Sequence, residues 1–414
     1  MEKRAIWHDK LGRLIRENNP HEGIDKTTTW CYDISGNILS RTEYAYTTGD
    51  LTGITPTATF AYTYGSNWKD QLVSFNGQSI AYDQSGNPTT YRGASLSWTR
   101  GRLLASYKAS GAVASTILAY DANGIRKHKV VPGTNHSTTT EFRYSGNNLL
   151  QEKVTVGVAG QASTTYRTYL YNSQGVMGFV QGGAEYIYHK NIFGDIVAIY
   201  QGATKIAEYS YDAFGNCTIV SDTDGIGANN PFRYRGYYWD SDLNLYYLMS
   251  RYYDPQTGRF INADSLEYLD PETIGGLNLF AYCLNNPVMG IDPAGTFISV
   301  ATALIILAIG TAIGIAGGVT KAIINGETGW EAVKSVFIGA AIGLMVAGFV
   351  VTIMGVFNVV GSGIAFAGKT IGFTAYRAIF EAGIQIVAIG SLAVDIPAVI
   401  IGGLTNTEWP LFKL

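Results

Sequence analysis

The 414-residue chain has few cysteines, few histidines and little net charge. The three cysteines are far apart and none belongs to a CxxC pair, which argues against a disulfide framework and against a zinc site. The five histidines form no HExxH or other metal-ligand pattern. A net charge of −3 gives no reason to expect a nucleic-acid partner. The composition therefore predicts no metal, no cofactor and no nucleic acid.

The N-terminal residues 1–23 include basic residues but no apolar stretch, so they do not have the pattern of a signal peptide. Ordinary repeat sequence follows directly. We expect the chain to begin inside a longer repeat array, either as a fragment or as the product of a short gene. A secreted or cell-surface location would then depend on an export route that the sequence does not identify.

Charged residues and tyrosines are concentrated in the first 295 residues. Residues 297–414 carry only five basic and five acidic side chains, although about a quarter of the residues of an average soluble domain are charged. The chain is therefore divided into two parts of different composition. The charged residues of the second part are Lys321, Glu327, Glu331, Lys334, Lys369, Arg377, Glu381, Asp395, Glu408 and Lys413.

A short motif, aromatic-Asp-x-x-Gly-Asn, recurs along the first part, with about twenty residues between close copies. At such a turn, Asp or Asn caps the backbone with its side chain, and Gly accepts the left-handed conformation needed at the exit. The motif therefore predicts a series of tight turns. Clear copies begin at Tyr32, Tyr82, Tyr120 and Tyr211, and degenerate copies begin at Tyr171, Asn191 and Tyr253.

The segments beside these turns, such as residues 58–64, 185–188 and 208–211, alternate in polarity and are rich in Thr, Tyr, Ile and Val. This pattern predicts half-buried β-strands. Because about twenty residues hold two strands and two turns, each repeat corresponds to one hairpin, and stacked hairpins would form a long, curling antiparallel ribbon. A sandwich or a propeller is the alternative, although propeller blades usually repeat at about 40 residues.

The stretch from Arg233 to Thr296 separates the two parts and contains a series of short motifs. Together with the repeats, this series resembles the rearrangement-hotspot (RHS) or YD-repeat family of polymorphic toxins, and it matches the RHS-associated core of that family. The looser likeness of the repeats covers residues 30–230 and excludes the tail. The motifs are RYRGYYWD (233–240), LYYLMSRYYDP (245–255), GRFINAD (258–264), NLFAY (278–282), NNP (285–287) and DPAG (292–295).

The resemblance implies a mostly β fold, in which a spiralling β-ribbon forms a hollow shell, the core plugs one end, and a toxic C-terminal segment is held inside. Because about 290 residues supply roughly a dozen hairpins, we expect a partial shell that is open on the N-terminal side. The expected domains are the YD-repeat ribbon (1–232), the core (233–296) and an apolar, Gly-rich, helical C-terminal segment (297–414).

The resemblance also implies that the core cuts its own chain just after the DPxG motif. It assigns Asp264 and Asp292 as a carboxylate dyad, Arg251 as the supporting cation, and Gly295, Thr296 and Phe297 as the cleavage region. Two neighbouring carboxylates cannot both ionise, so one acts as an acid while the other activates water. An arginine beside them would hold one carboxylate ionised and oriented. We expect a strand over residues 278–282 to return the chain between the aspartates.

This sequence departs from the family pattern at two positions. Ser265 stands where the family usually has Pro, which leaves Asp270, followed by Pro271, as a second candidate for the first aspartate. Thr296 stands where well-known members often have Leu, which leaves the position of the cut, and the cut itself, open. Asp-Pro pairs also start turns, and Arg251 could stack on the many tyrosines, so a purely structural role is the alternative.

The tail contains two charge-free runs, residues 297–320 and 335–368, and a weaker run at 382–404. The first two are long enough to span a bilayer, and glycines recur at helix-packing spacing. We therefore predict that the tail associates with membranes. The alternative is a buried helical bundle or an apolar segment packed inside the shell. The tail has no nuclease, ADP-ribosyl transferase or deaminase signature.

These observations lead us to predict a toxin-delivery protein for competition between bacteria: a β-shell that encloses a membrane-active C-terminal segment and releases it by aspartyl self-cleavage. At most, the chain is an autoprotease acting on itself. Its partners would be its own C-terminal segment as cargo, an immunity protein, a secretion apparatus or an N-terminal partner that completes the shell, and a lipid bilayer. Two alternatives remain: a surface or membrane-anchored adhesion protein without cleavage, and a remnant without its toxin.

Overall fold

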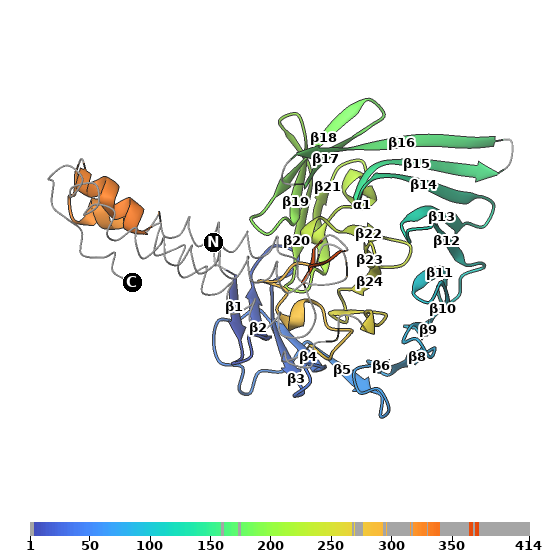
Figure 1. Ribbon diagram of the computed structural model, residues 1–414, viewed down its shortest axis with the longest axis horizontal. Coiled ribbons are helices and arrows are strands. Elements are labelled where there is room, and N and C mark those ends of the chain that lie inside the picture. The colour runs from blue at the N-terminus through green and yellow to red at the C-terminus, as the bar shows by residue number, and fades with distance from the viewer. Residues whose placement is uncertain are drawn as a thin grey trace. The chain divides into compact units, whose positions relative to one another are not determined.

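The computed structural model of the chain (Figure 1) contains two compact units, which are described separately. The ribbon unit comprises Met1–Leu269 with Ile274–Ile298, and the tail unit comprises Asp270–Thr273 with Ser299–Leu414. The predicted mostly β fold is confirmed. The structure describes residues 4–158, 161–172, 175–266, 269, 276–292, 295, 315, 318–328, 330–339, 364–366 and 369–371.

The ribbon unit begins with two antiparallel sheets in which each strand pairs with its neighbours in the sequence. This meander of hairpins is the arrangement that the period-two segments and regular turns predict. The seven-stranded sheet contains β1 (Ala5–His8), β2 (Leu14–Asn19), β3 (Lys26–Tyr32), β4 (Ile38–Ala45), β5 (Ala58–Tyr64), β6 (Leu72–Phe75) and β7 (Gln78–Ser79). The fourteen-stranded sheet contains β8 (Ala81–Tyr82), β9 (Pro88–Tyr91), β10 (Ala94–Thr99), β11 (Leu103–Lys108), β12 (Thr116–Tyr120), β13 (Arg126–Pro132), β14 (Ser137–Ser145), β15 (Asn148–Val158), β16 (Gln161–Asn172), β17 (Gly175–Gln181), β18 (Ala184–Lys190), β19 (Ile196–Gln201), β20 (Thr204–Tyr211) and β21 (Cys217–Asp222).

The four clear YD turns, and the degenerate copy at Asn191, share one hydrogen-bonding pattern. In the first clear copy, the Asp33 N–H donates to the Asn37 carbonyl at 2.9 Å, and the Asp33 carboxylate accepts the Asn37 N–H at 2.8 Å. Gly36 has a φ of 83°, which only glycine adopts without cost. The same pair of contacts closes the turns that begin at Asp83, Asp121, Asn191 and Asp212.

One further copy of this turn, at Asp9, has a sequence that does not match the motif. The Asp9 N–H donates to the Arg13 carbonyl at 2.9 Å, and its carboxylate accepts the Arg13 N–H at 2.9 Å. His8 and Arg13 stand where the motif has an aromatic residue and Asn, so the letters of the motif are lost while the Asp and Gly12 are kept. The repeats therefore begin closer to the N-terminus than the motif indicates.

Tyrosines join each repeat to the one before it. The Tyr32 hydroxyl donates to the Leu14 carbonyl at 2.6 Å, and the Tyr211 hydroxyl donates to the Ile196 carbonyl at 2.7 Å. Each accepting residue is a buried aliphatic residue near the start of a strand. Each tyrosine therefore links its own repeat to the buried part of the preceding repeat. The same contact links Tyr64 to Ile38, Tyr82 to Leu72, Tyr120 to Leu104 and Tyr171 to Leu149.

The first strands of the ribbon lie against its last hairpin. The Asn19 side chain donates to the Tyr211 carbonyl at 3.0 Å, and the Glu17 carboxylate accepts the Ala213 N–H at 3.0 Å. Gly23 packs so closely on Thr218 that an added Cβ would lie 2.6 Å from its methyl carbon. The ribbon therefore makes one turn, and its two ends meet (Figure 1).

Inside this turn lies a four-stranded core sheet, made of β22 (Tyr238–Asp240), β23 (Leu245–Leu248), β24 (Arg251–Asp254) and β25 (Arg259–Phe260) (Figure 1). Its residues are almost all buried, because both faces are covered by aromatic side chains of the ribbon and the core. Short helical segments accompany it, among them α1 (Ile226–Asn229), η1 (Tyr234–Gly236) and η3 (Cys283–Asn285).

The strand predicted over residues 278–282 is wrong. This segment consists of turns and makes one isolated bridge, between Arg259 and Ala281. The Asn278 side chain accepts the Phe280 N–H at 3.2 Å and donates to the Asn37 side chain at 2.8 Å, and this local bonding curls the backbone in place of a ladder. The segment still returns the chain to the core sheet, because the Phe260 N–H donates to the Phe280 carbonyl at 3.0 Å.

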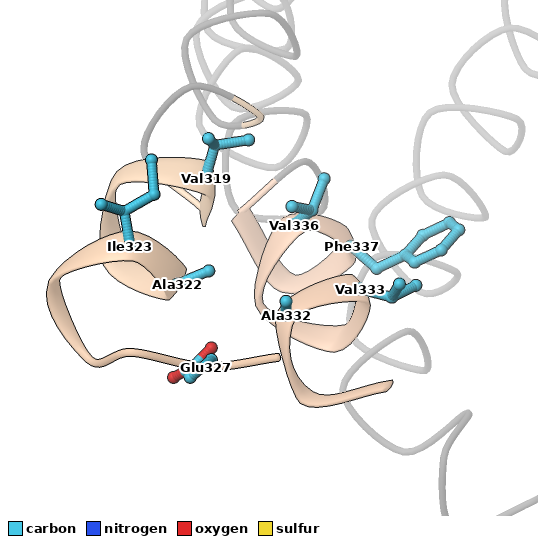
Figure 2. A pocket seen from close by; sticks show the side chains of 8 residues that line it. All are labelled: Val319, Ala322, Ile323, Glu327, Ala332, Val333, Val336 and Phe337. Carbon is cyan, nitrogen blue, oxygen red and sulfur yellow. The ribbon is translucent and has the colours of Figure 1, made fainter. Parts of the chain in front are cut away.

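The described part of the tail unit is mainly helical, with helical residues at 318–324 and 330–339. These two segments line a cavity of about 370 Å³ that is almost entirely apolar (Figure 2). A short hairpin joins β26 (Ile364–Phe366) and β27 (Lys369–Ile371). Within the residues that the structure describes, no helix is both long and apolar enough to cross a membrane. Most of the predicted runs at 297–320 and 335–368, and all of the run at 382–404, lie outside the described residues.

Candidate active site

The structure brings together the three residues that the family motifs single out. Arg251 lies on β24, and its Nη2 atom is 2.8 Å from Asp264 Oδ2 and 3.4 Å from Asp292 Oδ2. Because one nitrogen contacts both oxygens, the two carboxylates are close neighbours despite their separation in the sequence. All three side chains are almost completely buried.

Gly295 of the DPxG motif lies at the same place. Its carbonyl accepts hydrogen bonds from the Ser250 hydroxyl at 2.7 Å and from Arg251 Nε. Gly295 has a φ of 67°, and an added Cβ would lie 2.7 Å from the Leu248 carbonyl oxygen, so this position requires glycine. Thr296, Phe297 and the alternative aspartate Asp270 lie outside the described residues.

The guanidinium of Arg251 is fixed on every side. Its Nη1 donates to the Leu279 carbonyl at 2.9 Å, while Nε and Nη2 bind Gly295 and the two aspartates. Its central carbon lies 3.5 Å from the centroid of the Phe260 ring, a cation–π contact. The planar fork of arginine suits this role, because it orients several acceptors at once. Arg251 thus contacts carboxylates and an aromatic ring, not the ring alone.

Asp264 is held by contacts from both the core and the ribbon. Its backbone N–H donates to the Leu279 carbonyl at 3.0 Å, and its Oδ1 accepts the Ser265 N–H at 2.7 Å. The Oδ1 atom also lies 3.2 Å from Nη2 of Arg102, which precedes β11 of the ribbon. A proline at position 265 would lack the N–H donor, so the departure from the family pattern adds a bond to this carboxylate.

The backbone of Asp292 is anchored by two buried tyrosines. Its N–H donates to the Tyr237 hydroxyl at 2.9 Å, and that hydroxyl lies 3.0 Å from the hydroxyl of Tyr282. Tyr237 and Tyr282 come from two different core motifs, so the order of the motifs in the sequence assembles this support. Sequence reasoning did not assign a role to either tyrosine.

Burial controls the protonation of the cluster. Burial raises the pKa of Asp264 above its usual range, and the positive charges of Arg251 and Arg102 oppose that shift. Burial also lowers the pKa of Arg251, against the attraction of Asp264 and Asp292. Burial and the charge of Asp292 raise the pKa of the neighbouring Cys283 thiol, so this cysteine stays protonated and is a poor nucleophile.

A β-ribbon wound around a core sheet, with an Arg–Asp–Asp cluster beside a DPxG glycine, defines a shell protein. The family model that matches this chain is the Teneurin YD-shell, over residues 3–288. The chain therefore belongs to the RHS/YD-repeat family, as its motifs predicted.

Several proteins are similar to this chain over the ribbon and core. The tRNA nuclease WapA of Bacillus subtilis (strain 168) is 33% identical over 294 residues, which are 70% of this chain and 12% of that protein. The double-stranded DNA deaminase toxin A of Burkholderia cenocepacia (strain H111) is 24% identical over 315 residues, 70% of this chain and 20% of that protein. The crystal structure of TcdB2-TccC3-TEV matches in fold, with a TM-score of 0.57 and 20% identity over 71% of this chain and 15% of that one. The chain thus spans only a small part of its relatives' length.

Proposed function

We propose that this chain is the shell and core of a polymorphic toxin, and that its core cuts the backbone within residues 295–297 to free the C-terminal segment. The observation that carries the proposal is that Arg251 binds both carboxylates and the Gly295 carbonyl at the same time. The names of two relatives, a tRNA nuclease and a deaminase toxin, support a toxin as the wider context.

The proposed reaction is hydrolysis of one peptide bond by a paired-carboxylate mechanism. The ionised carboxylate takes a proton from a water molecule as the water oxygen attacks the carbonyl carbon, and the protonated carboxylic acid donates a proton to the leaving nitrogen. The C–N bond then breaks and yields one carboxylate and one amine, so that one water molecule is consumed. We assign the base role to Asp264, because Arg251 and Arg102 favour its ionised form while burial raises its pKa and so its basicity, and we assign the acid role to Asp292.

The hydrogen bonds to the Gly295 carbonyl support the position of the cut. Ser250 and Arg251 donate to the same oxygen, and donors of this kind stabilise negative charge on a carbonyl oxygen during attack. We infer from this that the peptide bond that is cut is either Gly295–Thr296 or Thr296–Phe297.

The released segment in this proposal is the apolar tail, with membranes as its target. Its low charge and its glycine spacing support this choice. Residues 318–324 and 330–339 line an apolar cavity, and some of its lining side chains, such as Ile323 and Phe337, are exposed. Exposed apolar side chains of this kind favour an apolar environment. Leakage of dye from lipid vesicles upon addition of a synthetic or separately expressed residues 297–414 segment tests this part; intact vesicles would refute it.

The self-cleavage part is tested by intact mass and a denaturing gel of the full-length chain beside Asp264→Asn and Asp292→Asn. We expect the wild type to split within residues 295–297 and both variants to stay whole, because each substitution removes one carboxylate of the pair. A wild-type chain that remains at 44.8 kDa would refute self-cleavage and would favour an anchored adhesion protein or a remnant.

A further inference from the structure

A residue of the ribbon, far from the core in the sequence, reaches the aspartate cluster. Arg102 lies between β10 and β11, and its Nη2 atom is 3.2 Å from Asp264 Oδ1 and 3.0 Å from the Ala263 carbonyl oxygen. The Ala263 N–H in turn donates to the carbonyl of Gly86, in the second clear YD turn, at 3.2 Å. Two turns of the ribbon thus bind both backbone groups of the residue that precedes Asp264.

The turn that carries Arg102 is itself held in place. The Asn87 side chain donates to the Gly101 carbonyl at 2.6 Å, and Trp98 Nε1 donates to the Pro88 carbonyl at 2.6 Å. Gly101 has a φ of 79°, which sets the direction in which the chain leaves the turn. The position of Arg102 therefore depends on the packing of two successive repeats, not on a flexible side chain alone.

The part of the ribbon that contains Trp68, Tyr82 and Gly86 also packs on core residues that neighbour Asp264. Trp68 and Tyr82 make edge contacts with the Phe280 ring, with ring centroids 5.5 and 6.0 Å apart. An added Cβ on Gly86 would lie 2.9 Å from Trp68 and 3.1 Å from Ala263, so ribbon and core are in tight contact here. This packing exists only where the ribbon and the core are folded against each other.

We propose that Arg102 is a positioning residue that makes self-cleavage depend on the ribbon having packed onto the core. This inference rests on the proposed function. Arg251 and Ser265 are both supplied by the core, whereas the second cation on Asp264 and the backbone anchors on Ala263 are supplied by the ribbon. A chain whose ribbon is unfolded therefore has an incomplete site, and it keeps its tail attached until the ribbon is in place.

The contact predicts a specific change in the pH dependence of cleavage. Among the residues that the structure describes, the charged groups around Asp264 are Arg251 from β24, Asp292 through the arginine that it shares with Asp264, and Arg102 from the ribbon. Removal of the Arg102 charge makes ionisation of Asp264 harder, so the acidic limb of the cleavage-rate profile moves to higher pH. Because Arg102 is one-third exposed, we expect a shift of about 0.5 to 1 pH unit, with a rate about 3- to 10-fold lower on that limb.

The experiment compares Arg102→Gln, Arg102→Lys and Arg100→Ala with the wild type. Gln removes the charge but keeps a donor for the Ala263 carbonyl, and Lys keeps the charge. Arg100 is the matched control, because it lies on the same turn and donates to the Tyr120 and Asp121 carbonyls within the ribbon. Each full-length chain is pulse-labelled during cell-free synthesis and chased at a series of pH values, and cleavage is followed on denaturing gels.

We expect Arg100→Ala to have the wild-type pH profile. Arg102→Gln should show the acidic limb at higher pH, and Arg102→Lys should return the limb most of the way to its wild-type position. A purely structural role would lower the thermal midpoint without moving the pH limb, so thermal unfolding is measured beside it. Cleavage of Arg102→Gln with wild-type rate and pH profile would overturn the inference while the proposed function stands. A wild-type chain that stays whole at every pH would remove the proposed function and this inference with it.

Discussion

Asp240 joins the core sheet to the ribbon through two buried cations, and its replacement tests how much this junction stabilises the fold. Its carboxylate binds Arg126 Nη1 and lies 2.5 Å from Lys129 Nζ, and both cations are on β13. Arg126 and Asp240 are completely buried. Although burial opposes ionisation of Asp240, the two cations lower its pKa below the usual range. The change to be made is Asp240→Asn.

The expected loss follows from what remains after the substitution. Arg126 would keep the rings of Phe142, Tyr238 and Tyr247 around its guanidinium and the Tyr252 hydroxyl at 3.0 Å, but no carboxylate. Removal of one partner of a buried ion pair costs about 3–5 kcal/mol, because the other charge is left uncompensated. We expect the free energy of unfolding to fall by about that amount.

The measurement is urea unfolding followed by aromatic fluorescence, with every chain carrying Asp264→Asn so that it remains uncut. Asp242→Asn is the matched control, because Asp242 also binds Lys129, at 2.8 Å, but its side chain is 34% exposed. Loss of this outer contact should cost less than about 1 kcal/mol. If Asp240→Asn and Asp242→Asn destabilised the chain equally, the ion pairs would not be the junction between ribbon and core.

Three further predictions concern titration and the cleavage site. Burial and the charge of Glu17 raise the pKa of Asp212 to about 6, so the folded chain binds this proton more tightly than the unfolded chain, and stability should fall by about 3 kcal/mol as the pH rises from about 4 to 7. Urea midpoints against pH should show this fall, and Asp212→Asn should flatten it; an unchanged slope would contradict the assignment. Gly295→Ala should slow self-cleavage at least about 10-fold, because its Cβ would clash with the Leu248 carbonyl; the fraction of intact chain on a gel measures this, and wild-type cleavage would show that the turn is not required. Ser250→Ala should slow cleavage by about 10-fold or more through loss of a donor to the Gly295 carbonyl, with an unchanged thermal midpoint; an equal rate would exclude that role.

Local turn chemistry could be predicted from the sequence because each YD turn is closed by residues within four positions of its Asp. The turn at Asp9 does not match the motif, because the motif includes an aromatic residue and a final Asn, whereas the closing bonds need only the Asp and the backbone of the last residue, with Gly12 in the left-handed conformation. The strand expected at 278–282 failed for a related reason: the need for a segment that returns the chain between the aspartates does not reveal that the Asn278 side chain will bind the neighbouring backbone.

The core residues Arg251, Asp264 and Asp292 could be picked out because their motifs match a family pattern, although their spacing alone would not have joined them. Arg102 could not be found in this way. Its contact with Asp264 depends on the total curvature of the ribbon between the N-terminus and β11. This curvature is the sum of the small twists between many neighbouring strands, which the sequence does not reveal. The meeting of Glu17 with Ala213 has the same origin.

The most direct measurement of the central claim is the mass of the N-terminal fragment after cell-free synthesis in water enriched in oxygen-18. Hydrolysis by the Asp264 and Asp292 pair places one water oxygen in the new C-terminal carboxylate, so the fragment should end within residues 295–297 and carry one heavy oxygen more than the same fragment made in ordinary water, after correction for label in side chains. An intact chain, or a fragment that ends elsewhere or without that oxygen, would contradict the account.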